Sequence, residues 1–319
     1  MNKRFTGIIP VLLSILTPAI LFACIKPKRQ PEQVHETQIT TTAYVSEEIY
    51  INLLHEDGVV ERLPLEKYIC GVVLREMPSD FEVEALKAQA IVARTYALRR
   101  ADGNPKHLEA AVCVDSSCCQ GYCSQSDYML EGGSESGLEK VTSAVYSTAG
   151  MVVVYNGELI EATYFSCSGG MTEDASAVWG ADIPYLQATA SPGEQNATHY
   201  TDTVSISIED FMFRLGLYGY KELEIENVEY TDGYGVASVS ICGESYSGTQ
   251  LRGLFGLNST RFDICVSGNQ VVISTQGFGH RVGMSQYGAD AMAVQGADCK
   301  QILQHYYQGV NLVQYADVH

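Results

Sequence analysis

Two groups of residues in this 319-residue chain are of types that do chemistry. The first is Glu76, a carboxylate that stands among apolar residues in the stretch Arg75-Glu76-Met77-Pro78. The second is a cluster of one histidine and four cysteines between residues 107 and 123. A buried carboxylic acid can donate a proton near neutral pH, and imidazole and thiolate are preferred ligands of zinc. The sequence therefore offers one candidate general acid and one candidate metal site.

The setting of Glu76 decides whether it can act as an acid. Its sequence neighbours are apolar and could raise its pKa by excluding water; they are Val72, Val73, Leu74, Met77 and Phe81. We expect Glu76 to lie on a loop in front of a helix that serves as its rigid mount. The alternative is that Glu76 caps a neighbouring helix or pairs with Arg75.

The metal candidates are His107, Cys113 and Cys119, spaced six and six residues apart. Zinc takes four ligands at about 2.0–2.3 Å in a tetrahedron, so a fourth is required. Cys118, Cys123, a water or a substrate oxygen could supply it. The alternative is a disulfide, for example between Cys113 and Cys123, which an extracytoplasmic setting would favour. We expect zinc in a structural role, holding a loop.

The helix that should carry this apparatus follows Glu76. Ser79 and Glu82 have the spacing of a capping box, which predicts a start at Ser79. Five residues at three- and four-residue spacing form one apolar face: Val83, Leu86, Ala90, Ala93 and Ala97. Because three of these are alanines, a partner element can approach closely.

The remaining patterns mix strands and helices. Hairpins are predicted at Asp57-Gly58 and Asn156-Gly157, both typical of type I′ turns. Helices are predicted over 138–149, near 248–256, and from Gln286 and Asp298 onward, with several strands in 223–275. Without regular strand–helix alternation, the α+β class fits better than α/β.

The N-terminal region differs from the rest. Residues 5–25 form an uncharged stretch long enough to span a bilayer, so we expect a membrane anchor over 1–30; a cleaved signal peptide is the alternative. A polar linker over 31–45 and a catalytic domain over 46–319 should follow, outside the cytoplasm. Past residue 30 the chain has 15 basic and 38 acidic residues, which argues against a nucleic-acid partner.

Three blocks of sequence resemble one known family. They are LPLEKYICGVVLREMPSDFEVEALKAQAIVARTYAL, TYFSCSGGMTEDASAVWGADIPYL and GFGHRVGMSQYGADAMAVQG followed by ILQHYYQG. Together they resemble the stage II sporulation protein D family, the sporulation lytic transglycosylases, over roughly residues 45–312. The family usually has glycine where this chain has Arg281.

The resemblance implies an enzyme that cuts peptidoglycan glycan strands during spore engulfment and leaves 1,6-anhydro ends. It implies that Glu76 is the catalytic acid, with the 6-hydroxyl of the sugar as nucleophile. It also implies denuded strands as substrate, an amidase partner that prepares them, and other engulfment membrane proteins alongside.

Further polar residues are candidates for binding the glycan. Lys87 and Arg94 share a face of the predicted helix, and two glycine-rich stretches supply hydroxyl, amide and imidazole groups near free backbone N–H donors. The candidates are Lys87, Arg94, Ser166, Ser168, His280, Ser285, Gln286 and Tyr287. For Trp179 we expect a core position rather than sugar stacking.

Two other functions compete with the transglycosylase. One is a non-catalytic wall-binding module that stimulates a partner amidase, which would have no need of Glu76. The other is a zinc hydrolase, but the His/Cys cluster lacks an H-E-x-x-H helix, and thiolate-rich sites are more often structural.

Overall fold

The computed structural model describes residues 48–103 and 105–318, which belong to one compact unit, Glu47–His319. The expected anchor over 1–30 and linker over 31–45 lie outside the described residues. None of the described helices combines the length and apolar character needed to cross a membrane.

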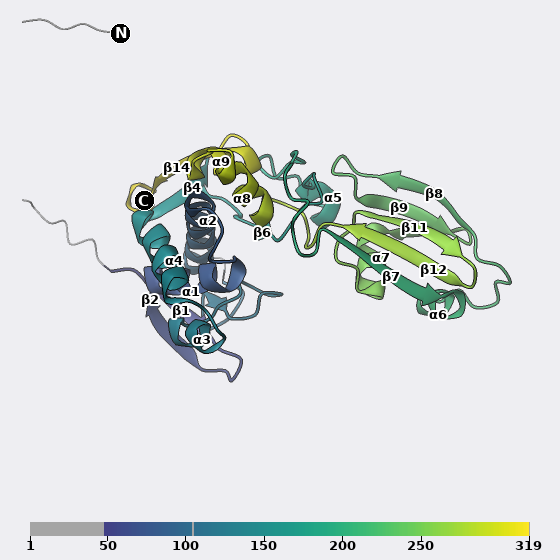
Figure 1. The fold of residues 1–319 in the computed structure, drawn as a ribbon, viewed down its shortest axis with the longest axis horizontal. Coiled ribbons are helices and arrows are strands. Elements are labelled where there is room, and N and C mark those ends of the chain that lie inside the picture. Colours follow the sequence, from purple (N-terminus) through teal and green to yellow (C-terminus); the bar gives the residue numbers. More distant parts are fainter. Residues whose placement is uncertain (1–47, 104, 319) are drawn as a thin grey trace, which may run out of the picture. The chain divides into compact units, whose positions relative to one another are not determined.

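Helices and short sheets alternate irregularly along the chain, which confirms the α+β class (Figure 1). The helices are α1 (Leu65–Glu76), α2 (Val83–Ala101), α3 (Gln125–Leu130), α4 (Glu135–Ser147), α5 (Ala175–Trp179), α6 (Ile208–Arg214), α7 (Gly248–Phe255), α8 (Gln286–Val294), α9 (Cys299–Tyr306) and the 3₁₀ helix η1 (Tyr315–Asp317).

The strands form five small sheets, with the orders β2-β1-β3, β10-β9-β8, β11-β12-β7, β13-β6 and β14-β4-β5. Their bounds are β1 (Tyr50–Leu54), β2 (Val60–Pro64), β3 (Val112–Cys113), β4 (Met151–Tyr155), β5 (Glu158–Leu159), β6 (Tyr164–Phe165), β7 (Thr201–Ser207), β8 (Ile225–Tyr230), β9 (Val236–Ile241), β10 (Glu244–Ser247), β11 (Phe262–Ser267), β12 (Gln270–Gln276), β13 (Met284–Ser285) and β14 (Asn311–Gln314).

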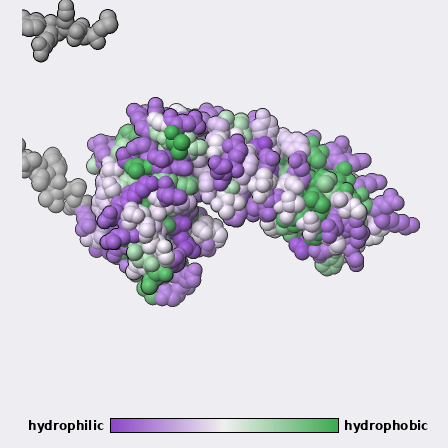
Figure 2. Space-filling model, viewed as in Figure 1, coloured by the Kyte–Doolittle hydropathy of each residue, from purple (hydrophilic) through white to green (hydrophobic). Residues whose placement is uncertain are grey.

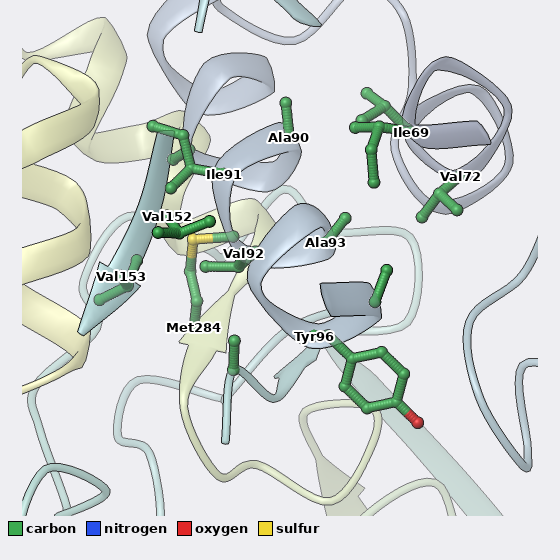
Figure 3. Packing of buried hydrophobic residues seen from close by; sticks show 14 of the residues in the cluster. Ile69, Val72, Ala90, Ile91, Val92, Ala93, Tyr96, Val152, Val153 and Met284 are labelled. Carbon is green, nitrogen blue, oxygen red and sulfur yellow. The ribbon is translucent and has the colours of Figure 1, made fainter. Parts of the chain in front are cut away.

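Helix α2 is the centre of the larger hydrophobic core. It is buried along nearly its whole length and contacts α1, α4, α8, α9 and β4. Figure 3 shows Ala90 and Ala93 on the side of α2 that faces Ile69 and Val72 of α1, with Ile91 toward β4. The alanines have no bulk to keep these neighbours away, so the expected close packing is confirmed.

The position of Glu76 corrects the sequence interpretation. Glu76 is not on a loop; it is the last residue of α1. The valines and Gly71 in this segment have weak helix propensity, which hides the helix. Burial of one face stabilises the helical conformation instead. Tyr68, Ile69, Val72 and Val73 recur at helical spacing and are fully buried.

The start of α2 also differs from the prediction. The helix begins at Val83, with Glu82 as its N-cap and no capping hydrogen bond from a side chain. The hydroxyl of Ser79 accepts a hydrogen bond from the Tyr128 hydroxyl instead, and the Glu82 N–H donates to Asp290. Tertiary partners therefore replace the capping box.

The two hairpins turn differently. Asn156 and Gly157 both have positive φ, 52° and 86°, which confirms the type I′ turn between β4 and β5. At the first hairpin only Gly58 has positive φ, and its N–H donates to the carbonyl of His55. The β1–β2 hairpin therefore forms as predicted, but its turn is not type I′.

A second hydrophobic core lies in residues 201–276. Strands β7 to β12 pack with α6 and α7 around Phe211, Val239, Leu251 and Ile273. Figure 2 shows hydrophobic residues gathered on the visible face of this part of the molecule. We call residues 201–276 the inserted subdomain, because the chain returns from it to complete the larger core with α8 and α9.

A buried ion pair ties the inserted subdomain to the segments on either side of it. Arg281 and Glu173 are 0% and 1% exposed, with 3.2 Å between Nη1 and Oε1. Arg281 also donates to the carbonyl of Gly233, and Glu173 accepts from the N–H of Gly235, both in the β8–β9 turn. Arg281 has φ +66°, a left-handed conformation that glycine adopts at little cost. Its side-chain bonds hold arginine there despite the strain.

We predict that Arg281→Gly destabilises the protein by about 2–4 kcal/mol. Breaking a buried pair costs about 3–5 kcal/mol, and glycine relieves roughly 1 kcal/mol of left-handed strain. Urea denaturation measures the change. Adding Glu173→Met should restore part of the stability, since the unpaired carboxylate is then gone. An Arg281→Gly variant as stable as the wild type would show that the ion pair does not hold the two segments together.

Candidate active site

A pocket of about 950 Å³ opens beside the end of α1. Its wall comes from α1, α2, Lys106, the 116–120 loop, the 161–163 segment, β6, α5, α7, the 278–280 loop and the start of α8. The lining residues are Glu76, Tyr96, Arg100, Lys106, Ser116, Ser117, Cys118, Cys119, Gln120, Glu161, Ala162, Thr163, Tyr164, Phe165, Ser166, Trp179, Arg252, Phe278, Gly279, His280 and Gln286.

Glu76 is half-buried in this wall. Its Oε1 accepts a hydrogen bond of 2.6 Å from the backbone N–H of Gly121. Any side chain at 121 would crowd the carboxylate, because a Cβ there would lie 3.0 Å from Oε1. Burial raises the pKa of Glu76, and this outweighs the hydrogen bond from Gly121, which favours the charged form. The negative end of the α1 dipole acts in the same direction as burial.

Three polar groups near Glu76 have no hydrogen-bond partner among the described residues. They are the hydroxyl of Tyr164 and the side-chain nitrogens of Gln120 and Gln286, all buried. Tyr164 and Gln286 approach Glu76 closely enough to favour its charged form, although neither makes a bond of normal geometry to it. Buried donors are normally satisfied, so these are suited to the polar groups of a ligand.

Sequence reasoning missed Tyr164 and Gln120. Tyr164 stands two residues before Ser166, in a stretch that already attracted notice, and Gln120 precedes Gly121. The sequence feature that points to both residues is the high local density of polar and aromatic residues near glycines.

Glu161 is the second carboxylate in the pocket wall. Its two oxygens pair separately with Arg99 and Arg100. Both carboxylate oxygens of Glu161 are thus already engaged by guanidinium groups. Glu76 is therefore the one carboxylic acid of the described pocket that is available for proton transfer.

Of the candidate ligand-binding residues, the structure brings Ser166, His280 and Gln286 into the pocket with Glu76. Burial lowers the pKa of His280 to about 4, so its imidazole is neutral at pH 7. Its Nδ1 accepts from the N–H of Val282. Its ring lies 5.3 Å from that of Trp179.

Trp179 corrects a sequence expectation. Its side chain does not lie in the core: it is 43% exposed and lines the pocket. Trp179 is the last residue of the short helix α5, which ends at the αL residue Gly180.

Lys87 and Arg94 lie away from the pocket wall. Lys87 pairs with Glu84 at 2.8 Å. Arg94 is fully buried and pairs through two nitrogens with Glu66. The guanidinium of Arg94 therefore serves packing between α2 and α1 in this structure.

Ser168 and Ser285 act behind the pocket. Both hydroxyls donate to the buried carboxylate of Glu194, which also accepts from the N–H groups of Ser168 and Gly169. Ser285 is at the same time the N-cap of α8, directly before Gln286. Glu194, which sequence reasoning missed, thus fixes the segment after Ser166 and the start of α8.

Tyr287 is not among the residues that line the pocket. Its ring packs against Phe81 at 4.9 Å between centroids. This contact links the start of α8 to the segment between α1 and α2, and so helps to position both.

The metal candidates come together beside the pocket. The ligand atoms of His107, Cys113, Cys118 and Cys119 all lie within 4.8 Å of one another, so the cluster could hold a metal ion. His107 Nε2 is 3.4 Å from the sulfur of Cys119 and 3.7 Å from that of Cys118. The donor set fits a soft ion. Cys123 is not in the cluster, and none of the nine cysteines in the described ranges forms a disulfide.

Comparisons with known proteins identify the family of the chain. A family model described as stage II sporulation protein matches residues 55–155, which include Glu76 and the metal candidates. The chain is 40% identical to stage II sporulation protein D of Bacillus amyloliquefaciens, over 79% of this chain and 75% of the relative. It is 38% identical to that of Bacillus subtilis, with the same coverage. The chain therefore belongs to the stage II sporulation protein D family.

A more distant relative carries another name. The chain is 30% identical to a protein of Bacillus subtilis named amidase enhancer, over 77% of this chain and 40% of the relative. The names of the two closer matches place the family in sporulation. The name of this third relative connects that relative with an amidase.

The raised pKa of Glu76 predicts a pH-dependent effect of Glu76→Gln on stability. A charged carboxylate that burial disfavours destabilises the folded state above its folded pKa. The penalty vanishes below the unfolded value of about 4.3. Glu76→Gln should therefore be more stable than the wild type at pH 7, with the difference fading toward pH 4.

Urea denaturation at both pH values tests this, with the exposed Glu139→Gln on α4 as the matched control. A Glu76→Gln variant that is less stable at pH 7 by the same amount as at pH 4 would show that burial does not disfavour the charge.

Proposed function

We propose that this protein is a lytic transglycosylase that cleaves the glycan strands of peptidoglycan during engulfment. The observation that carries the proposal is Glu76, a half-buried acid with a raised pKa, alone in its pocket as a free carboxylate. Membership of the stage II sporulation protein D family supports the setting in sporulation.

Cleavage of the glycosidic bond needs only one carboxylic acid when the sugar itself supplies the nucleophile. Glu76 donates its proton to the glycosidic oxygen as the bond from that oxygen to C1 breaks. The 6-hydroxyl oxygen of the same sugar bonds to C1, and its proton passes to the Glu76 carboxylate. The acid is restored, no water is consumed, and a 1,6-anhydro end remains.

The donors around Glu76 suit this reaction. The Gly121 N–H holds the carboxylate in place after it has lost its proton. Tyr164, Gln120 and Gln286 offer unpartnered polar groups for the hydroxyl and acetamido groups of the sugars. Ordinary glycosidases use two carboxylates at fixed separation, whereas Glu161 is bound to two arginines here. This favours transglycosylation over hydrolysis.

The second candidate function is a non-catalytic module that stimulates a partner amidase. The name of the amidase enhancer relative favours it. A pure binding module would gain nothing from an acid whose pKa burial raises, so we place it second.

We further propose that the metal is zinc and that it is structural. His107, Cys113 and Cys119 would hold it, with Cys118 as fourth ligand. When bound, zinc would fasten the loop that ends in Gly121. In this way it would keep the Gly121 N–H against Glu76 without taking part in proton transfer.

We also propose a location for the protein, from its sequence. Residues 5–25 would anchor the chain in the membrane and leave the catalytic domain outside the cytoplasm. Its partners there would be glycan strands, a sporulation amidase and other engulfment membrane proteins. Sedimentation with membranes and sensitivity to added protease test this; a soluble, shortened form would indicate signal-peptide cleavage instead.

Glu76→Gln should lower glycan cleavage by about 10²–10⁴-fold, because glutamine keeps the volume but has no proton to donate. The rate is measured by chromatography of fragments released from purified glycan strands. Glu139→Gln, on the exposed side of α4, is the control. Glu76→Gln cleaving at more than a tenth of the wild-type rate would rule out Glu76 as the acid.

Untagged full-length protein should contain about one equivalent of zinc, by mass spectrometry of the metal. Cys119→Ser should lose the zinc, whereas Cys265→Ser, at an exposed cysteine outside the cluster, should retain it. Protein with less than about a tenth of an equivalent and without free thiols at Cys113 and Cys119 would instead contain a disulfide.

A further inference from the structure

The inserted subdomain contributes one charged residue to the pocket. Arg252, in the last turn of α7, lines the pocket together with Glu76. No other residue of 201–276 lines it, within the ranges that the structure describes. The second hydrophobic core, which is separate from that of α2, thus presents a single guanidinium to the site.

The side chain of Arg252 is fixed in position. Its Nε donates to the carbonyl of Leu257 at 3.2 Å, and the N–H of Leu257 donates back to the Arg252 carbonyl. Gly256, with φ +65°, makes the turn that brings these groups together. The two terminal nitrogens remain available, so the planar fork is held ready for a ligand.

Arg252 is half-buried, and none of the carboxylates in the described chain pairs with it. Burial lowers its pKa, and no neighbouring acid opposes that effect. The other pocket arginine, Arg100, differs because Glu161 neutralises it. A desolvated cation without an anion is costly, which points to an anion supplied by the ligand.

The surroundings of Arg252 agree with a sugar-bound anion. His280 lies near it and is neutral, so it does not add to the charge. The rings of Trp179 and Phe165 lie 5.3 Å and 5.5 Å from the His280 ring. Aromatic faces bind the apolar faces of sugars, while a fixed guanidinium binds a carboxylate through two hydrogen bonds.

We propose that Arg252 forms a carboxylate-binding subsite that selects glycan strands with free lactyl carboxylates. This rests on the proposed function, because a wall glycan carries a lactyl group on alternate sugars. The group is a carboxylate when no peptide is attached and an amide when one is. The subsite lies at the Trp179–His280 side of the pocket, and the inserted subdomain supplies its only charge.

Binding of short strands to the full-length Glu76→Gln protein tests the subsite without cleavage. The probes are peptide-free strands, the same strands with lactyl methylamides, and peptide-bearing strands with free terminal carboxylates. With Arg252 intact, peptide-free strands should bind roughly 10- to 100-fold more tightly than the methylamides, the range for a hydrogen-bonded charge. Adding Arg252→Gln should bring this ratio close to one.

Two further variants distinguish the effect of losing the Arg252 guanidinium from the effect of destabilising the inserted subdomain. Arg214→Gln removes an exposed arginine of the same subdomain that pairs with Asp210, and it should retain the full ratio. Arg252→Lys keeps the charge without the fork and should retain part of the ratio. Both variants should unfold at the temperature of the parent.

The outcomes distinguish this proposal from the proposed function. A ratio near one in the parent, or an unchanged ratio in Arg252→Gln, overturns the subsite. Tighter binding of peptide-bearing strands, lost in Arg252→Gln, assigns Arg252 to the peptide carboxylate and overturns the lactyl assignment. Wild-type protein that shows the preference but does not cleave overturns the proposed function and leaves the subsite standing.

Discussion

The hydrogen bond from the Gly121 N–H to Glu76 joins two segments 45 residues apart in the sequence, and the pocket is organised around it. On one side stands α1, which carries the carboxylate at its C-terminal end. On the other is the loop that follows the His/Cys cluster. Burial raises the pKa of Glu76, and the Gly121 N–H acts in the opposite direction while it fixes the position of the carboxylate.

Helix α2 holds the first of these segments in place. Helix α2 packs against α1 through alanines, and so fixes the end of α1 to which Glu76 belongs. Figure 3 shows the ring of Tyr96 pointing away from the other labelled side chains, and Tyr96 lines the pocket. The buried carboxylate of Glu194 orders the segment after Ser166 and the start of α8. The polar groups near Glu76 are thus fixed by buried contacts from several directions.

Much of this could be predicted from the sequence, and the failures have identifiable causes. Alternation and turn residues predicted the hairpins and the α+β class, and Cys and His spacing predicted the cluster. Helix α1 was missed because tertiary burial overrides the weak propensity of its valines and Gly71. The capping box at Ser79 failed because Tyr128, distant in sequence, takes the hydroxyl.

The site shows the same limit. Ser166, His280 and Gln286 line the pocket as predicted. Residue type could not show that Arg94 forms an ion pair with Glu66, or that Arg252 reaches the pocket from the inserted subdomain. Those facts depend on contacts between segments far apart in the chain, which no local pattern records.

The mass of the products from wild-type protein tests the central claim most directly. If Glu76 acts alone and the sugar supplies the nucleophile, the new ends of peptide-free strands are anhydro sugars, one water lighter than reducing ends. Mass spectrometry of the fragments distinguishes the two. Anhydro ends throughout are the result we predict; reducing ends that incorporate oxygen from labelled water would contradict it, because a water molecule would then be the nucleophile.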